Sequence, residues 1–366
     1  MLMLGIESSC DETAVAVIKF SKENFTGKLL SHVVLSQVDD HKKFGGVFPE
    51  VASRLHLEKI DHVFKHAVHL ADIDIKDIDF IAATCGPGLI GSVVVGASFG
   101  KALSVSLDKP FIAVNHLLGH ALMPRFVHKS LEFPYLLVLV SGGHSIIGIL
   151  HGPDNFEKLG STIDDSAGEC FDKVARMLDL PYPGGPNIEK LAALGDSGKY
   201  EFPIPLNDKS CKMSFSGLKT AVLYKINELK EENKGDLSVH QKSDIAASFQ
   251  KTVVDVFEKK IVNALRGKRE SLKKNLVNAI VFSGGVASNK AIRDMGEAIA
   301  TKYKLKFCAP TIELCTDNAA MIAWAAIEML KAKSSKTKSS IGVSLNDLFD
   351  DIGSDIINKN IFLESE

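Results

Sequence analysis

Four glycine-rich turns, each following a strand-like run, constrain the fold of this chain more than any other feature. They lie at 5–13, 85–92, 140–145 and 282–289, with the sequences GIESSCDET, CGPGLIGS, VSGGHS and FSGGVASN. Short apolar runs that end at such turns are typical of buried strands in an α/β fold. Turns of this kind bring backbone N–H groups close to phosphate oxygens. None has the Walker A lysine or the GxGxxG spacing, but together they favour a nucleotide cleft between two lobes.

The spacing of apolar residues predicts strands and helices between these turns. Strand-like runs at 13–18 and 29–35 flank a polar stretch and predict a hairpin. Residues 134–150 predict a strand, a Gly-Gly turn and a second strand, and a buried strand is expected at 79–84. Helices are expected at 54–71, 92–107, 166–178, 243–266 (capped by Ser243) and 316–332. The turns at 140–144 and 282–286 follow similar strands, which is a weak internal echo.

These elements predict two lobes and a tail. We expect a first lobe of residues 1–130, joined by a returning helix at about 316–332, and a second lobe of residues 131–315. Residues 333–366 are expected to form a flexible or peripheral tail, because KAKSSKTKSS has the composition of a linker.

Composition sets limits on the class of protein. The chain has 366 residues, 45% of them hydrophobic and 24% charged, which is ordinary for a globular protein with two cores. Its formal net charge of −2 gives no global basic field, so any RNA contact needs a local patch or a partner protein. The strongest basic run is EKKIVNALRGKRESLKKN, at 258–275, and the alternative for it is a solvated surface.

The location of the protein is predicted from what its sequence lacks. The six cysteines form no CxxC pair, so neither a zinc knuckle nor a thioredoxin-type site is indicated. Free thiols fit a reducing compartment. The N-terminal segment lacks the features of a signal peptide, and we find no run of about 18 apolar residues. We therefore expect a cytoplasmic protein with no membrane contact.

A pair of histidines lies four residues apart in VNHLLGHALMP. On a helix, His116 and His120 would share one face and could bind one metal, and the alternative is two helix histidines without a metal. A metalloprotease of the HExxH type needs a glutamate beside the first histidine, and Leu117 occupies that position. A third ligand must come from elsewhere. Asp317 in CTDN is attractive, although a helix N-cap is its alternative.

Two groups of carboxylates lie near the predicted turns. Glu7, Asp11 and Glu12 in ESSCDET could hold a cation or position a reacting group, or could form a solvated turn. In DDSAGECFDK, the three acids Asp165, Glu169 and Asp172 fall near one helical face. They could bind sugar hydroxyls or form the solvated side of the helix.

Long motifs in one order, from residue 5 to about residue 325, carry a resemblance to a known family. They include GIESSCDETAVAV, HKKFGGVFPEVASRLH, CGPGLIGSVVVG, VNHLLGHALMP, LVSGGHS, IDDSAGECFDK, YPGGP, MSFSGLKTA, SGGVASNK and CTDNAAMIA. The chain resembles the tRNA N6-adenosine threonylcarbamoyltransferases of the actin–hexokinase–Hsp70 superfamily. Its N-terminal start and overall length are similar to the bacterial or organellar branch.

The resemblance implies an α/β fold of two ribonuclease-H-like lobes around a nucleotide cleft. It implies transfer of a threonylcarbamoyl group from threonylcarbamoyl-adenylate to N6 of the adenosine next to the anticodon, with release of AMP. The substrates would be tRNAs that read codons beginning with A. The family's metal ligands match His116, His120 and Asp317, with one iron or zinc ion per subunit. Its nucleotide-site positions match Val140, Ser141, Gly142, Gly143, His144, Asp172, Gly185, Asn289 and, in some members, Glu189.

The same resemblance implies partners: a paralogue that forms a heterodimer and a small ATPase, as in bacteria, or a second copy of the chain, as in organelles. The adenylate donor, made with ATP by a separate synthase, is already activated, which fits the lack of a Ser/His/Asp or Cys/His set. We expect Asp11 or Glu12 to accept the proton released from N6, because both lie beside a phosphate turn.

Two departures and two alternatives accompany the resemblance. Ser145 stands where threonine is commoner, and the tail lacks the Arg/Pro/Trp ending of many bacterial relatives. An ATPase of the same superfamily would share the glycine turns but would use Mg²⁺ on oxygen ligands, so the histidine pair argues against it. A non-enzymatic assembly factor would not need the metal ligands.

Overall fold

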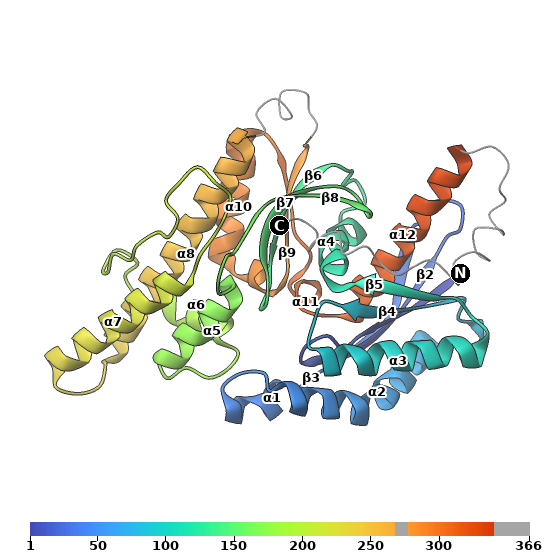
Figure 1. Ribbon diagram of the computed structural model, residues 1–366, viewed down its shortest axis with the longest axis horizontal. Coiled ribbons are helices and arrows are strands. Elements are labelled where there is room, and N and C mark those ends of the chain that lie inside the picture. The colour runs from blue at the N-terminus through green and yellow to red at the C-terminus, as the bar shows by residue number, and fades with distance from the viewer. Residues whose placement is uncertain (268–276, 340–366) are drawn as a thin grey trace.

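The computed structural model describes residues 1–267 and 277–339, with side chains to residue 334. Two five-stranded sheets form its framework (Figure 1). The first sheet has the order β3-β2-β1-β4-β5, and the second has the order β10-β9-β6-β7-β8. The first-sheet strands are β1 Leu2–Glu7, β2 Glu12–Phe20, β3 Gly27–Ser36, β4 Phe80–Gly86 and β5 Phe111–Asn115. The second-sheet strands are β6 Tyr135–Val140, β7 Ser145–Gly152, β8 Asn155–Ser161, β9 Ala279–Ser283 and β10 Lys306–Cys308.

The two sheets are built alike. Each has an antiparallel meander of three strands, β1-β2-β3 and β6-β7-β8, extended by two parallel strands. The predicted hairpins between 13–18 and 29–35 and within 134–150 are therefore confirmed. The sequence similarity of the turns at 140–144 and 282–286 has a structural reason, because β6 and β9 are parallel neighbours whose carboxyl ends meet.

Helices cover both sheets in layers (Figure 1). On the outer face of the first sheet lie α2 Pro49–Ala71 and α3 Ile90–Leu107. On the outer face of the second sheet, α8 Val239–Gly267 and α10 Lys290–Tyr303 contact the strands. The same core includes α5 Ala167–Met177, α6 Gly184–Ala192 and α7 Ser216–Asn233. Between the sheets lie α4 His116–Val127 and α12 Ala319–Ser339. The short elements are α1 Val38–His41, α11 Ile312–Cys315 and three 3₁₀ turns, η1 Lys42–Phe44, η2 Ile75–Asp77 and η3 Gly285–Ser288.

The middle layer joins the two sheets through one apolar core. Alternation along β6 places Leu137 and Leu139 in this core and Val138 and Val140 in the outer one, as the period of a strand requires. Side chains of β1, α4, β9 and α12 complete the middle core. We propose that each sheet is the centre of one lobe, with a boundary near residue 130. The two lobes then share buried surface in this middle core.

Two predicted features of the helices were wrong. The helix expected at 243–266 begins earlier, at Val239, so Ser243 lies inside α8, where its hydroxyl donates to the carbonyl of Val239 at 2.9 Å. The helix expected at 316–332 begins at Ala319 and continues to Ser339, so the linker predicted from residue 331 is helical there. Residues 340–366 of the expected tail and 268–276, which include part of the basic run, lie outside the described residues.

Among the described residues, one helix, α3, is long and apolar enough to cross a membrane by length and composition alone. Helix α3 has 18 residues and a mean hydropathy of 1.5, and only 17% of it is buried. Its small residues Ser92, Gly96 and Gly100 pack on the first sheet, while Ile90, Val94 and Val105 are exposed. One such helix is weak evidence for a membrane span.

Candidate functional site

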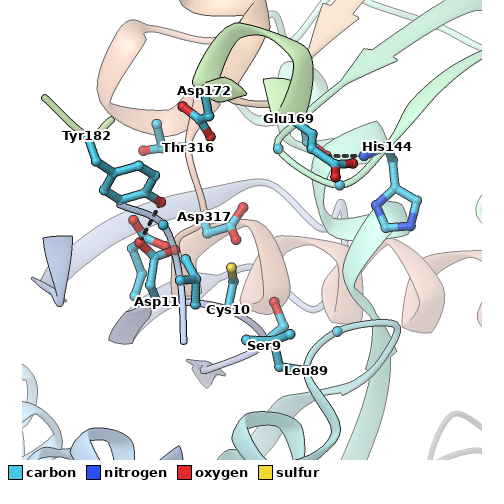
Figure 2. A pocket seen from close by; sticks show the side chains of 18 of the residues that line it. Ser9, Cys10, Asp11, Leu89, His144, Glu169, Asp172, Tyr182, Thr316 and Asp317 are labelled. Carbon is cyan, nitrogen blue, oxygen red and sulfur yellow. Dashed lines mark hydrogen bonds between the residues drawn. The ribbon is translucent and has the colours of Figure 1, made fainter. Parts of the chain in front are cut away.

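A cavity of about 630 Å³ opens where the ends of the two sheets face each other (Figure 2). Its volume suits a nucleotide-sized ligand. All four glycine-rich turns contribute to its lining, through Ser9–Glu12, Pro87–Leu89, Ser141–His144 and Gly285. Helix α5, the loop 45–47 and the segment Thr316–Asp317 complete the walls. The cleft predicted from the turns is therefore present.

The turns pack against one another in pairs. The amide of Leu89 donates to the carbonyl of Ser9 at 2.8 Å, which joins the first two turns. Gly284 has a φ of +93°, and a Cβ at this position would lie 2.4 Å from the carbonyl oxygen of Val140. Only glycine allows the fourth turn to approach the third this closely. Val140 itself is buried at the end of β6 and does not line the cavity.

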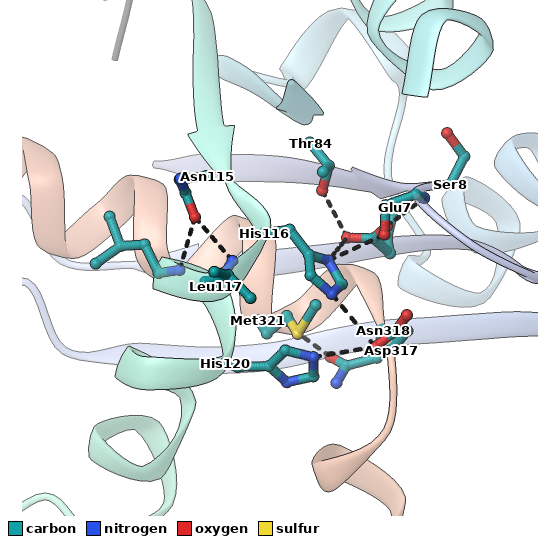
Figure 3. Close-up of polar contacts among 12 residues, drawn as sticks. Glu7, Ser8, Thr84, Asn115, His116, Leu117, His120, Asp317, Asn318 and Met321 are labelled. Atoms are coloured by element: carbon teal, nitrogen blue, oxygen red, sulfur yellow. Dashed lines mark hydrogen bonds and ion pairs between the residues drawn. The ribbon is translucent and has the colours of Figure 1, made fainter. Parts of the chain in front are cut away.

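Three side chains converge beside the cavity as a potential metal site (Figure 3). The ligand atoms of His116, His120 and Asp317 all lie within 4.8 Å of one another. Asp317 Oδ1 lies 3.0 Å from His120 Nε2 and 3.5 Å from His116 Nε2. The histidines occupy the first and fifth positions of α4, which Asn115 caps by accepting from the amides of Leu117 and Leu118. Asp317 is not a helix N-cap, because Asn318 accepts the amide of Met321 instead.

A buried glutamate orients the first histidine. Glu7 Oε2 lies 3.1 Å from His116 Nδ1 and accepts the hydroxyl of Thr84 at 2.5 Å. Burial opposes the charge of Glu7, but nearby His116 outweighs it and lowers the pKa of this carboxyl. The arrangement leaves His116 Nε2 facing Asp317 and His120, so the donor set fits a bound metal whose ligand is oriented by a carboxylate.

Charge within the triad is balanced in the same way. Burial favours the neutral forms, but His116 holds the pKa of Asp317 at about 2, and Asp317 with Glu7 raises the pKa of His116 to about 9. His144 lies at the cavity wall, where burial and the two other histidines lower its pKa to about 4. His144 is therefore neutral at pH 7.

An acidic pair occupies the opposite wall. Asp11 Oδ2 accepts the hydroxyl of Tyr182 at 3.2 Å, which links the first turn to the second sheet's side of the cleft (Figure 2). Burial first, and then the charge of Asp11, raise the pKa of Glu12 well above its usual range. The neutral form of Glu12 is thus favoured next to Asp11. Tyr182 also has a raised pKa, because of burial and the same acids.

The three acids expected along one face of α5 have different roles. Asp172 lines the cavity and accepts the amide of Gly184 at 2.7 Å, at the start of α6. Burial raises its pKa to about 6. Glu169 also borders the cavity and pairs with Lys173 at 2.8 Å. Asp165 instead pairs with Lys173 and Lys219 away from the lining.

Three of the predicted nucleotide positions lie behind the wall. Gly185, at the start of α6, is not part of the lining, and its amide bonds Asp172. Asn289 caps α10 by accepting the amide of Ile292 at 3.1 Å and donates to Gln250. Glu189 accepts the amide of Lys290 at 2.7 Å. These three residues support the elements that surround the cavity.

Several lining residues were not predicted as site residues. Ser9, Tyr182, Arg176 and the loop 45–47 reach the cavity from distant parts of the chain. The loop and Tyr182 lie in quoted motifs, HKKFGGVFPEVASRLH and YPGGP, whose glycines were the available signal. Arg176 had no signal, because an arginine on an amphipathic helix usually faces solvent.

Comparison with known proteins gives one consistent family. A family model described as tRNA N6-adenosine threonylcarbamoyltransferase matches residues 28–324. Curated proteins of that name are 49% identical over 90% of this chain and 95% of their own length in Thermosipho africanus, and 47% identical over 90% of both chains in Bartonella tribocorum. A Pelagibacter ubique protein of the same name is 48% identical over 91% of this chain and 90% of its own length.

Solved structures share the fold at low identity. HypF from T. kodakarensis gives a TM-score of 0.58 at 16% identity, over 95% of this chain and 48% of that protein. A full-length HypF, described as phosphate- and nucleotide-bound, gives 0.56 at 16% identity, over 94% of this chain and 56% of its own. The predicted α/β fold is confirmed by the two five-stranded sheets and by the likeness to these two structures.

Proposed function

This chain belongs to the tRNA N6-adenosine threonylcarbamoyltransferase family, and we propose on that premise that its cavity is the site of threonylcarbamoyl transfer. The protein is an acyltransferase that modifies tRNA. It moves the threonylcarbamoyl group from threonylcarbamoyl-adenylate to N6 of the adenosine next to the anticodon, in tRNAs that read codons beginning with A, and AMP leaves. The observation that carries the proposal is the cavity itself, which brings the His116–His120–Asp317 triad and four glycine turns together.

His116, His120 and Asp317 would hold one iron or zinc ion. Two imidazoles and one carboxylate suit either metal, and Glu7 behind His116 fixes the ring. The bound ion would supply Lewis-acid polarisation of oxygens on the donor. His144 is neutral beside the triad and can accept or donate one hydrogen bond without adding charge.

The glycine turns and Asp172 bind the donor in this proposal. A Cβ built on Gly142 or Gly143 has no atom within 4 Å, so phosphate oxygens can approach the backbone of this turn closely. Asp172, fixed by the amide of Gly184, is placed to accept hydroxyls of the donor's ribose. The donor is a mixed anhydride, so attack by N6 needs positioning more than an enzyme nucleophile.

The acidic pair accepts the proton. N6 attacks the carbamoyl carbon, the bond from this carbon to the phosphate oxygen breaks, and AMP departs with the electron pair. N6 loses one proton in the process. Asp11 lines the cavity, and we assign the proton to Asp11; its hydrogen-bonded neighbour Glu12 has a pKa raised by burial and by the charge of Asp11.

Protein partners are part of the proposal. The apolar exposed side of α3, with Ile90, Val94 and Val105, is a surface that a partner chain would cover. The partner is a paralogue acting with a small ATPase, or a second copy of this chain. We further propose a cytoplasmic location, where unmodified tRNA is available.

One experiment tests the function. Purified protein is mixed with preformed threonylcarbamoyl-adenylate and unmodified tRNA, with and without a bacterial partner pair, and digested nucleosides are analysed by mass spectrometry. We expect threonylcarbamoyl-adenosine from the wild type and none from a His116→Ala/His120→Ala variant. Product from both proteins would remove the metal from the mechanism. No product from the wild type with partners present would overturn the transferase.

A further inference from the structure

A series of hydrogen bonds through three buried side chains joins two walls of the cavity. The amide of Phe48 donates to His41 Nδ1 at 3.3 Å, and His41 Nε2 lies 3.2 Å from Gln37 Oε1. Gln37 Nε2 lies 3.3 Å from His56 Nδ1, and His56 Nε2 lies 2.9 Å from the carbonyl of Cys10. The side chains of His41, Gln37 and His56 are fully buried.

The two backbone groups at the ends of this hydrogen-bond series determine which atom donates in each of its bonds. The carbonyl of Cys10 can only accept, so His56 Nε2 carries the hydrogen and His56 Nδ1 is an acceptor. The amide of Phe48 can only donate, so His41 Nδ1 accepts and His41 Nε2 donates to Gln37. The amide of Gln37 completes the series with one orientation. Both imidazoles are neutral in this arrangement, and burial lowers the pKa of His56.

Each end of the hydrogen-bond series supports one wall of the cavity. His56 bonds the carbonyl of Cys10, in the turn that carries Asp11 and Glu12, and the hydroxyl of Thr13 also bonds His56 at 2.7 Å. The backbone amide of Gln37 donates to the carbonyl of Asp11 at 2.9 Å. The acidic turn is thus tied to this network at successive carbonyls.

At the other end lies the loop 45–47, which lines the cavity but has little packing of its own. No side chain from 42 to 50 is buried, and Phe44 and Phe48 are 42% and 44% exposed. Its position depends on polar contacts. His41 holds it from the first sheet's side through Phe48, and Arg176 of α5 donates to the carbonyls of Phe44 and Gly45 from the second.

We propose that His41 and His56 are positioning residues for the transfer reaction, which rests on the proposed function. His56 places the acidic turn, and therefore the proton acceptor. His41 places the loop 45–47 against the donor. Gln37 determines which nitrogen of each ring carries the hydrogen. His56 then donates from Nε2 to the acidic turn, and His41 accepts at Nδ1 from Phe48 beside the loop. A change at His56 then acts on kcat, and a change at His41 acts on KM for the adenylate.

Substitution by asparagine or by glutamine distinguishes the roles of the two ring nitrogens of each histidine. An asparagine amide superposes on Nδ1, whereas a glutamine amide reaches the position of Nε2. At residue 56, H56Q keeps the bond to Cys10 and H56N loses it. At residue 41 the order reverses, because H41N keeps an acceptor for Phe48 and H41Q loses it.

The test is a steady-state comparison of these four variants with preformed adenylate, at a temperature where thermal melts show all of them folded. We expect H56N to lower kcat about 10-fold, while H56Q stays within about 3-fold of the wild type. We expect H41Q to raise KM for the adenylate about 10-fold, while H41N stays within about 3-fold. Size or general destabilisation cannot produce a preference for glutamine at one position and asparagine at the other.

Equal effects of both substitutions at either position, or the same amide preferred at both, would overturn the proposal. Hydrogen exchange provides a readout that does not need turnover. The Phe48 amide should exchange slowly in the wild type and H41N and at least about 10-fold faster in H41Q. If the wild type forms no product, the proposed function fails, and this exchange pattern still decides whether His41 anchors the loop.

Discussion

His120 Nε2 lies 3.0 Å from Asp317 Oδ1, although 197 residues separate the two in the chain. The contact joins α4 to the segment before α12, the two helices that lie between the sheets. The potential metal site therefore sits on the shared core, where both supporting helices are packed on both sides. A site held this way keeps its geometry without depending on a mobile loop.

Loss of Asp317 should empty the metal site. Asp317→Ala removes the only carboxylate of the triad and leaves two imidazoles as ligands, so the metal content of the purified protein should fall from about one ion per chain to near zero. Elemental analysis after dialysis measures it. Asp255→Ala, which removes a surface acid paired with Lys251 on α8, is the matched control and should keep its metal. Full metal content in Asp317→Ala would place the ion elsewhere.

Glu7 should raise the metal affinity of the same site through its contact with His116. Glu7→Gln keeps the shape of the side chain but replaces the charge that faces His116 Nδ1, so metal affinity should fall about 10- to 100-fold. Competition with a chelator of known affinity measures the change. Thr84→Val is the control, because it removes one donor to Glu7 and leaves its charge. Its effect should be smaller, and equal losses in the two variants would contradict the electrostatic explanation.

Substitutions of Asp11 and Glu12 should have effects of different size on the reaction. Asp11→Asn removes the proposed proton acceptor and should lower the single-turnover rate about 100-fold or more. Glu12→Gln replaces a carboxyl whose pKa burial and Asp11 raise well above its usual range, so its effect should be about 10-fold or less. Rapid-quench measurement with preformed adenylate compares the two rates. A larger loss in Glu12→Gln would transfer the role of acceptor to Glu12.

The sequence predicts those parts of the site that depend on local pattern. The glycine turns and the histidine pair are visible because each lies within a few residues, and the sheets follow from the apolar runs that precede the turns. The partners of these residues are not visible. Glu7 faces His116 across 109 residues, and Arg176 reaches Gly45 across 131. Ser243 shows a second limit of prediction from sequence. A serine can occupy a helix N-cap or a helix interior, and in α8 it lies in the interior, where its hydroxyl bonds the carbonyl of Val239.

The start of α5 packs on the third glycine turn without room for a side chain. A Cβ on Gly168 would lie 2.7 Å from both the Cα of Gly142 and the carbonyl oxygen of Ser141. Gly168→Ala should therefore displace this turn, lower the free energy of unfolding by about 1–3 kcal/mol and weaken AMP binding. Gly217→Ala is the control, because nothing lies within 4 Å of its Cβ in α7, and it should stabilise the protein by about 0.5 kcal/mol. Chemical unfolding and calorimetry measure both, and a stable Gly168→Ala with normal AMP affinity would contradict the contact.

Asp172 should make the stability of the protein depend on pH. Its pKa is about 6 in the folded state, mainly because of burial, against 3.8 for an ordinary aspartate. The folded state thus holds this proton up to a higher pH than the unfolded state does. The contribution is most favourable below about pH 4, declines as pH rises to about 6, and is constant above that.

Asp172→Asn tests this directly, because asparagine does not titrate and still accepts the amide of Gly184. The variant should match the wild type near pH 4 and exceed it by about 2 kcal/mol in free energy of unfolding at pH 8. Urea unfolding at both pH values gives the difference, in which groups common to the two proteins cancel. A difference independent of pH would show that Asp172 is not held near neutrality by burial. The same variant should bind AMP more weakly, because an amide presents one acceptor where the carboxylate presents two to the ribose hydroxyls.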